Sequence, residues 1–227
     1  MHIGPLLGSG RTADVYALDD SWVLRRYRGD TDATAELAVM SYLSAHGYPL
    51  PRIGPPGGAE VLPQDLVIQR LTGPTLADAL LAGTVTMAEG ADVLARLLRE
   101  LHAIPPRISQ DPADRILHLD LHPENVMLAP RGAVVIDWTT AAEGPPALDR
   151  AVSSLILAQI AVDPEFTAGA NVQALLATFL ERLADDGGVP ADALTRATAL
   201  RAVNPGLSDR EKALLDEAAA LVTALTD

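Results

Sequence analysis

The chain has 227 residues, of which 48% are hydrophobic, enough for one large core or two small lobes. It contains no cysteine, which excludes a disulfide framework, a cysteine metal site and a thiol nucleophile. Its net charge of -13 argues against a nucleic-acid-binding surface and suits a cationic substrate, although an acidic surface also simply confers solubility.

The first residues, Met-His-Ile-Gly-Pro, lack the basic and apolar regions of a signal peptide. The longest apolar stretch lies near residues 155–162 and is too short to span a bilayer. We therefore expect a cytoplasmic protein without a membrane partner.

Residues 6–27 predict three strands. A Gly-Ser-Gly turn at residues 8–10 separates the first two, and an Asp-Asp turn at residues 19–20 precedes the third, at residues 22–27. A glycine turn lets backbone N–H groups approach phosphates closely. An ordinary hairpin turn uses the same glycines, so both readings stay open.

Residues 34–45 predict an amphipathic helix with Leu37, Met40 and Leu43 on one side. Glu36 lies near its start. Taken alone, Glu36 is a solvated carboxylate that complements the helix dipole.

Residues 49–58 form a proline-rich loop, and residues 59–62 and 65–71 predict two further strands. The composition then changes at residues 72–74, which read Thr-Gly-Pro. We interpret the break as a hinge. It divides the chain into an N-terminal lobe, residues 1–71, and a C-terminal lobe, residues 72–227.

The C-terminal lobe is predicted to be mostly helical. The expected helices lie at residues 76–81, 87–101, 146–162, 170–184, 191–203 and 209–226. The helix at 146–162 is strongly apolar and is expected to be central and buried. Ser208 and Glu211 form a capping-box signature for the last helix. His102 is expected to pack structurally.

The most informative stretch, residues 118–125, reads His-Leu-Asp-Leu-His-Pro-Glu-Asn. Residues 126–128 form a short apolar run, and residues 133–136 predict a buried strand that ends at a carboxylate, Asp137. A Pro-Arg-Gly turn between the runs predicts a hairpin. That hairpin would bring Asn125 and Asp137 together at one end.

Two oxygen ligands there suit Mg²⁺, which completes its octahedron with water and phosphate oxygens. Asp120 would then lie one phosphoryl group away, where an acceptor hydroxyl must be oriented and must lose its proton. Asp, Asn and Pro are each ordinary loop residues. Their order, with strand patterns where the chemistry needs them, is what predicts phosphoryl transfer.

The pattern resembles the catalytic loop and the metal-binding aspartate of the protein-kinase-like superfamily. The residues at 118–125 and at 136–138 are similar to those of the aminoglycoside phosphotransferase and choline kinase branch, which mostly phosphorylates small molecules. The resemblance implies a two-lobed α+β fold: a small antiparallel β-sheet N-lobe with one helix, and a mainly helical C-lobe with a catalytic β-hairpin. It also implies ATP and Mg²⁺ as cofactors.

The resemblance assigns nucleotide-binding roles to a set of residues that comprises Gly8, Ser9, Gly10, Val15, Arg25, Glu36, Gln69, Leu71 and Met127. The backbone of Gln69 to Leu71 would hold adenine between Val15 and Met127. For those last two residues, an ordinary core position remains an open alternative.

The resemblance also makes Asp120 the catalytic residue and Asn125 and Asp137 the metal ligands. His118 and His122 would support the loop.

Asp149 resembles the aspartate that braces the catalytic loop, while a helix N-terminal carboxylate stays an equal alternative. Eleven residues separate Asp137 from Asp149, and they contain no Ala-Pro-Glu. No long activation segment fits there, which favours the small-molecule branch over a regulated protein kinase.

The chain departs from the family pattern in its third strand, which should carry a phosphate-binding lysine. Lys212, in the last helix, is the only lysine of the chain. Arg25 is the best substitute, and Arg26, which points to the opposite face, is the fallback. Arginine keeps the charge, but its guanidinium is longer and planar, so the geometry is not equivalent.

Two functions remain in competition: an ATP-dependent kinase for a small-molecule hydroxyl, and a catalytically weak or inactive nucleotide-binding module of the same fold. A protein-modifying kinase is disfavoured by the short segment after Asp137. The acceptor, for which an amine or amino sugar is one option, would be selected by the C-terminal helices. The candidate side chains are Asp163, Glu165, Asp185 and Asp186.

Overall fold

The computed structural model describes residues 3–10, 12–29, 32–54 and 62–226. The chain forms two compact units, one of residues 1–73 with 127–139 and one of residues 74–126 with 140–227. The expected α+β fold, with an antiparallel sheet near the N-terminus and a mostly helical remainder, is confirmed.

The grouping by contacts places residues 127–139 with the N-terminal residues. The division into lobes 1–71 and 72–227 remains a prediction. Among the described residues, no helix is long and apolar enough to cross a membrane.

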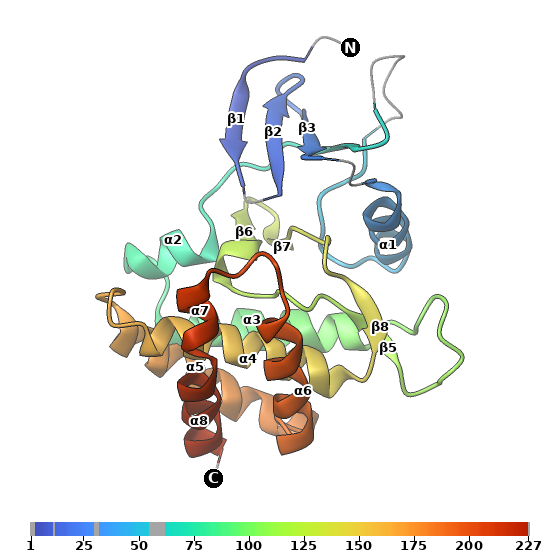
Figure 1. The fold of residues 1–227 in the computed structure, drawn as a ribbon. Helices are drawn as coiled ribbons and strands as arrows, with labels where there is room; N and C mark the ends of the chain where they lie inside the picture. Colours follow the sequence, from blue (N-terminus) through green and yellow to red (C-terminus); the bar gives the residue numbers. More distant parts are fainter. Residues whose placement is uncertain (1–2, 11, 30–31, 55–61, 227) are drawn as a thin grey trace. The chain divides into compact units, whose positions relative to one another are not determined.

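The first unit contains a four-stranded antiparallel sheet in the order β1-β2-β3-β4. Figure 1 labels its first three strands. Its strands are β1 (Leu6–Ser9), β2 (Ala13–Ala17), β3 (Trp22–Tyr27) and β4 (Asp65–Gln69). Asp19 forms the turn before β3, since its Oδ1 accepts hydrogen bonds from the backbone of Ser21 and Trp22. The strand expected at residues 65–71 ends at Gln69. The strand expected at residues 59–62 lies outside the described residues, except Leu62, which is not in a strand.

Helix α1 (Thr34–Ala45) has the predicted bounds, but its buried face differs from the prediction. The buried residues are Glu36, Val39, Met40 and Leu43. Leu37, expected on the buried side, is exposed. Positions i, i+3, i+4 and i+7 form one helical stripe, so a face that starts at residue 36 leaves residue 37 at its edge.

The predicted hairpin is present as β6 (Val126–Ala129) and β7 (Gly132–Val135). The expectation of a buried strand at residues 133–136 is wrong in part. The strand ends at Val135, and within β7 only that residue is fully buried. Because β7 pairs with β6 alone in a two-stranded sheet, its remaining side chains are partly or fully exposed.

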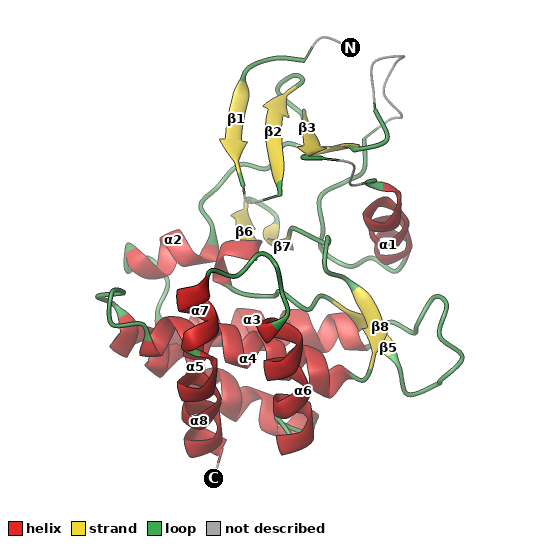
Figure 2. Ribbon diagram, in the orientation of Figure 1, coloured by secondary structure: helices red, strands yellow, loops and turns green. Residues whose placement is uncertain are grey.

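The second unit is largely helical (Figure 2). Its helices are α2 (Leu76–Leu81), α3 (Met87–His102), α4 (Pro146–Val162), α5 (Gly169–Leu183), α6 (Ala191–Ala202), α7 (Asp209–Ala213) and α8 (Leu215–Thr226). As expected, α4 is central: it packs against α5, α6 and α8, and every residue from Asp149 to Gln159 is buried. A helix that is apolar on all sides is stable only when other elements surround it.

The single helix expected at residues 209–226 is two helices. The capping box of Ser208 and Glu211 starts α7 as predicted, but the helix stops at Leu214. Leu214 is the C-cap of α7, and its backbone N–H lies toward the carbonyls of Arg210 and Lys212.

Four short elements were not predicted. They are β5 (Arg115–Leu117), which pairs with β8 (Ala142–Gly144), and two 3₁₀ turns, η1 (Pro123–Asn125) and η2 (Ala184–Asp186). Three residues are too few to display a periodicity.

Gly73 provides a test of the contact between the end of the N-terminal segment and the hairpin. Its φ is +124°, and a Cβ there would lie 2.1 Å from the carbonyl oxygen of Leu128. We expect Gly73→Ala to lower the free energy of unfolding by about 3 kcal/mol or more, from backbone strain plus overlap. The control is Gly83→Ala, where φ is +68° and the added methyl meets nothing within 4 Å, at a cost of about 1 kcal/mol. Equal losses in urea denaturation would contradict this account.

Candidate functional site

Arg25 in β3 is the centre of a buried ionic cluster in the first unit. Its Nη1 lies 3.1 Å from Oε1 of Glu36, so the expected ion pair is present. Its Nη2 lies 2.7 Å from Oδ1 of Asp137. Because an unpaired buried cation is strongly disfavoured, these two carboxylates make the position of Arg25 tolerable.

Arg26 lies on the other face of β3. Its Nε and Nη2 each lie 2.7 Å from one carboxylate oxygen of Asp65, in a bidentate pair. Successive side chains of a strand point to opposite faces. Of these two neighbouring arginines of β3, Arg25 is therefore the one that contacts Glu36 and Asp137.

Glu36 binds several donors at once. Its Oε1 accepts a hydrogen bond from the backbone N–H of Trp138 at 3.0 Å, and its Oε2 accepts one from the hydroxyl of Tyr27. Burial raises the pKa of Glu36, Arg25 opposes that shift, and Asp137 adds to it. Sequence reasoning missed Tyr27, although it lies two residues after Arg25 and hence on the same face of the strand.

Asp137 adopts a left-handed backbone with φ of +63°, which is uncommon for a residue other than glycine. Its Oδ1 accepts hydrogen bonds from Arg25 and from the hydroxyl of Thr139, the latter at 2.6 Å. The side chain is 36% exposed. The cluster thus places the partly exposed carboxylate of Asp137 beside the guanidinium of Arg25, which Glu36 also binds.

The glycine turn has the geometry of a hairpin connection. The backbone N–H of Gly10 donates to the carbonyl of Ala13 at 2.9 Å, and the hydroxyl of Ser9 binds Asp14 and Arg28. At Gly8 an added Cβ would meet nothing within 4 Å, so the backbone there is open. A phosphate-binding role for the turn remains a prediction.

The residues expected around adenine are partly exposed. Val15 opposes Arg25 in the β2–β3 register, and Met127 lies in β6. Neither is fully buried, and their contact with adenine remains a prediction. Gln69 and Leu71 are also partly exposed, at and just beyond the end of β4.

In the second unit, Asn125 is oriented by Asp120. Its Nδ2 donates to the backbone oxygen of Asp120 at 2.9 Å and to the carboxylate Oδ2 at 3.2 Å. The same nitrogen lies 3.1 Å from Nε2 of His122. With its amide nitrogen turned toward this loop, Asn125 keeps its amide oxygen for another ligand. Asp120 itself is partly exposed.

Asp149 binds the backbone of the loop at residues 118–125. This contact favours a loop-bracing role for Asp149 over that of a simple helix N-terminal carboxylate. It is fully buried and accepts hydrogen bonds from the backbone N–H of His118 at 3.0 Å and of Leu119 at 2.7 Å. The third contact is Nε2 of His102, 3.0 Å away. Burial alone would raise the pKa of Asp149, but these contacts hold it below its usual value. They also hold Leu119 at a φ of +60°.

Arg201 and Gln159 were missed by sequence reasoning. Nη1 of Arg201 lies 3.9 Å from Oδ1 of Asp120, and its Nε donates to Oε1 of Gln159 at 2.6 Å. Both side chains are buried. The available signal was an arginine in helical register with Leu194 and Ala197, which form the buried face of α6.

The four carboxylates named for acceptor selection are mostly paired. Asp163 and Glu165 both bind Arg210, and Asp186 binds Arg99 at 2.8 Å. Asp185 is exposed.

Among residues 3–10, 12–29, 32–54 and 62–226, no group of three or more His, Asp or Glu side chains could hold a metal. The expected Mg²⁺ ligands, one amide and one carboxylate, do not need such a group, because Mg²⁺ keeps several waters and binds substrate phosphates. The partly exposed carboxylate of Asp137 and the amide of Asn125 each offer the kind of oxygen that Mg²⁺ binds, and their role as its ligands remains a prediction.

The sequence matches the family described as "Phosphotransferase enzyme family" over residues 4–115 and 82–184. No curated protein matches the chain.

Solved structures are similar in fold. The gentamicin complex of APH(2")-IIa has a TM-score of 0.62 at 13% identity and covers 96% of this chain and 90% of its own. A thermostable mutant of the aminoglycoside phosphotransferase APH(4)-Ia, with AMP-PNP and hygromycin B, scores 0.63 at 15% identity, covering 99% and 94%. A choline/ethanolamine kinase family protein from Mesorhizobium loti scores 0.55 at 15% identity, covering 99% and 88%.

The brace is testable through stability. We expect Asp149→Asn to lower the free energy of unfolding by about 3 kcal/mol, because a buried acceptor of three hydrogen bonds loses its charge. The folded-state pKa of Asp149 is lowered, so its contribution is present above the ordinary carboxyl pKa and is lost as pH falls below it. The variant should therefore show a weaker loss of stability in acid, measured by urea denaturation across pH.

The matched control is Asp92→Asn, which removes an exposed carboxylate that binds Arg182. That change should cost less than about 1 kcal/mol. A variant at residue 149 with the stability and acid response of this control would refute the brace.

Proposed function

Since the chain belongs to the phosphotransferase enzyme family, we propose that it transfers the γ-phosphoryl group of Mg-ATP to a hydroxyl group of a small molecule. The observation that carries the proposal is the Arg25 cluster. It places a cation, held by a buried glutamate, beside a partly exposed carboxylate. Phosphoryl transfer needs both a cation and an oxygen ligand near the phosphates.

In this proposal Arg25 supplies the charge for which the family uses lysine. Glu36 keeps Nη1, and Nη2 turns from Asp137 to a phosphate oxygen. Guanidinium suits this role because its several donors have fixed directions. The N–H groups of Gly8, Ser9 and Gly10 would cover the phosphates.

The adenine position follows from the same assignment. The backbone of Gln69 to Leu71 would hydrogen-bond the base, between Val15 and Met127. The partial exposure of these side chains supports contact with a ligand.

Asn125 and Asp137 are the proposed ligands of Mg²⁺. They flank the same hairpin, Asn125 directly before β6 and Asp137 two residues after β7. When bound, Mg²⁺ neutralises charge on the phosphates. The amide oxygen of Asn125 and the carboxylate of Asp137 would each give it one protein oxygen.

Asp120 is the proposed catalytic residue. It would accept a hydrogen bond from the acceptor hydroxyl, orient that oxygen toward the phosphorus, and take its proton. Asn125 restrains the Asp120 carboxylate through Nδ2, while His118 and His122 support the loop.

The acceptor is proposed as a small hydroxylated molecule. The similar structures include proteins in complex with gentamicin and with hygromycin B, and a choline/ethanolamine kinase family protein. An amine or amino sugar is therefore one option, which the net charge of -13 also supports. Arg201 beside Asp120 opposes it locally, because it places a positive charge near the proposed reacting hydroxyl.

One contact favours a second candidate, a catalytically weak nucleotide-binding module. Arg25 occupies an oxygen of Asp137, the carboxylate that the metal would need. If this pair persisted with nucleotide bound, Mg-ATP would stabilise the protein without transfer to an acceptor.

The role of Asp120 is tested by Asp120→Asn in an ATP-dependent transfer assay. We expect kcat to fall by about 10²–10⁴-fold, the range for loss of a positioned general base. Glu124→Gln, an exposed neighbour on the same loop, is the control and should retain activity. Undiminished transfer by Asp120→Asn would remove the assigned role.

The role of Arg25 is tested by nucleotide affinity. Arg25→Gln should weaken ATP binding about 10- to 100-fold, since it removes a charged donor to phosphate. Arg25→Lys should retain more affinity than Arg25→Gln because it keeps the charge. Arg26→Gln, on the opposite face, should lose stability but keep its affinity for ATP. If the change at residue 26 weakened ATP as much as the change at residue 25, the assignment would be wrong.

A further inference from the structure

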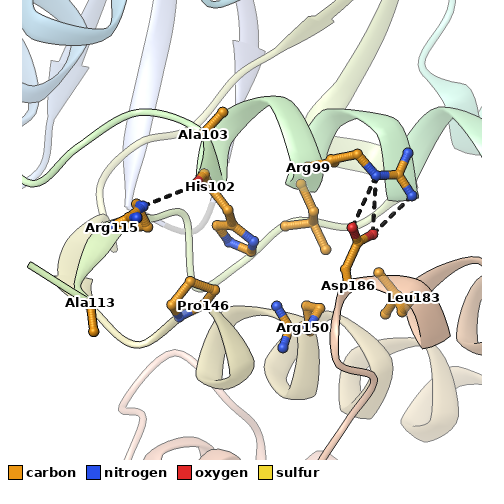
Figure 3. A pocket seen from close by; sticks show the side chains of 10 residues that line it. Arg99, His102, Ala103, Ala113, Arg115, Pro146, Arg150, Leu183 and Asp186 are labelled. Carbon is orange, nitrogen blue, oxygen red and sulfur yellow. Dashed lines mark hydrogen bonds and ion pairs between the residues drawn. The ribbon is translucent and has the colours of Figure 1, made fainter.

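A basic pocket lies in the second unit, and none of its lining residues is assigned a contact with nucleotide, metal or acceptor in the proposed phosphotransfer. Its volume is about 280 Å³, and its lining comes from α3, β5, α4, the end of α5 and η2 (Figure 3). The charged and titratable lining residues are Arg99, His102, Arg115, Arg150 and Asp186. This volume lies just below the range of about 300–1,000 Å³ that drug-sized ligands occupy, which indicates a smaller ligand.

Arg99 is already neutralised within the pocket wall. Its Nε lies 3.1 Å from both carboxylate oxygens of Asp186, and its Nη2 lies 2.8 Å from Oδ2. The remaining contact of Nη2 is the carbonyl of Arg182. The charges of Asp186 and Arg99 therefore offset each other. The remaining positive charge on the pocket wall comes from Arg115 and Arg150.

Arg115 is held by backbone carbonyls. Its Nε donates to His102 at 3.0 Å, and its Nη1 donates to Pro112 at 2.7 Å and Asp114 at 2.6 Å. Within the part of the chain that the structure describes, it has no carboxylate partner. Carbonyls orient a guanidinium but leave its full positive charge.

Arg150 is the more unusual of the two. It is 7% exposed, and its Nε donates to the carbonyl of Gly188 at 2.7 Å. Among the described residues, neither Nη1 nor Nη2 has a hydrogen-bond acceptor or an ion-pair partner. Arg150 lines the pocket from α4 (Figure 3).

The position of Arg150 is costly without a ligand. Burial lowers the pKa of its guanidinium, and the more distant carboxylates Asp186 and Asp149 offset this in part. A buried cation whose donors face a cavity gains most from an anion placed there.

We propose that this pocket is a binding site for a small phosphate-type oxyanion, held by Arg150 and Arg115. Two guanidiniums without carboxylate partners match the two charges of a phosphate dianion, and each offers donors that phosphate oxygens accept. The site is distinct in composition from the proposed catalytic loop. A protein with a net charge of -13 repels anions in general, so binding here depends on the local pair.

The test is calorimetric titration of the full chain with inorganic phosphate, at ionic strength matched with chloride. We expect Arg150→Gln and Arg115→Gln each to weaken phosphate affinity at least about tenfold, from loss of a charged donor. Arg96→Gln is the matched control, because Arg96 is an exposed arginine of α3 that binds Glu100. That variant should bind phosphate like the unmodified chain.

Phosphate could also enter the proposed nucleotide site, so Arg25→Gln is a second control. Binding that survives Arg25→Gln and is lost in Arg115→Gln supports the pocket. Binding lost in Arg25→Gln alone, or unchanged in every variant, overturns it, as does an absence of phosphate binding to the unmodified chain. If Arg150→Gln does not fold, Arg115→Gln, at a partly exposed residue, decides the outcome.

A methyl phosphate titration separates the two sources of this anion. Affinity equal to or above that of inorganic phosphate indicates the phosphate group of an organic ester. A marked preference for inorganic phosphate indicates the free ion. Binding of chloride and phosphate with equal affinity would contradict an oxyanion site.

Discussion

The buried positive charge of Arg25 is the constraint on which the first unit depends. A guanidinium with so little exposure requires partners, and Glu36 and Asp137 supply them from helix α1 and from the segment after β7. Trp138 completes the arrangement through its backbone N–H, which binds Glu36, and through an edge-on ring contact with Tyr48. The same ion pairs that join residues 127–139 to the N-terminal residues therefore also place a cation beside the carboxylate proposed for metal binding. Arginine serves here because its two terminal nitrogens contact two carboxylates separately, which a single ammonium does less readily.

In the second unit, the buried negative charge of Asp149 imposes a similar constraint. Asp149 on the central helix α4 accepts hydrogen bonds from the backbone of the proposed catalytic loop and contacts His102, so the loop conformation and the core helix stabilise each other. The hydrogen bond from the backbone N–H of Leu119 to Asp149 maintains the left-handed backbone of Leu119. The residue after it in the chain, Asp120, is the proposed base. One turn of α4 thus carries two opposite requirements, since Arg150 follows Asp149 directly and faces the basic pocket.

Local patterns predicted the parts of this protein that depend on neighbours in sequence. The strands β1 to β3, the bounds of α1 and the hairpin follow from period-two and helical patterns and from turn residues. The partner of Arg25 was expected only through a family resemblance, and its second contact, with Asp137, was not foreseen. Arg201 beside Asp120 depends on how α6 packs against α4, which no local pattern contains. The break at Leu214 has neither Gly nor Pro to announce it, and β5 and β8 are too short for a period.

In the proposed function, an arginine-based phosphate site supports phosphoryl transfer to a hydroxyl group. The most direct measurement is ADP formation from Mg-ATP across a panel of hydroxylated amines, sugars, amino-acid alcohols and nucleosides, with the phosphorylated product quantified in parallel. We expect at least one acceptor to raise ADP formation in step with formation of its phosphate ester, and removal of Mg²⁺ to abolish both. Magnesium-dependent stabilisation by ATP, with no acceptor in the panel raising ADP formation, would contradict phosphoryl transfer and indicate a nucleotide-binding module instead.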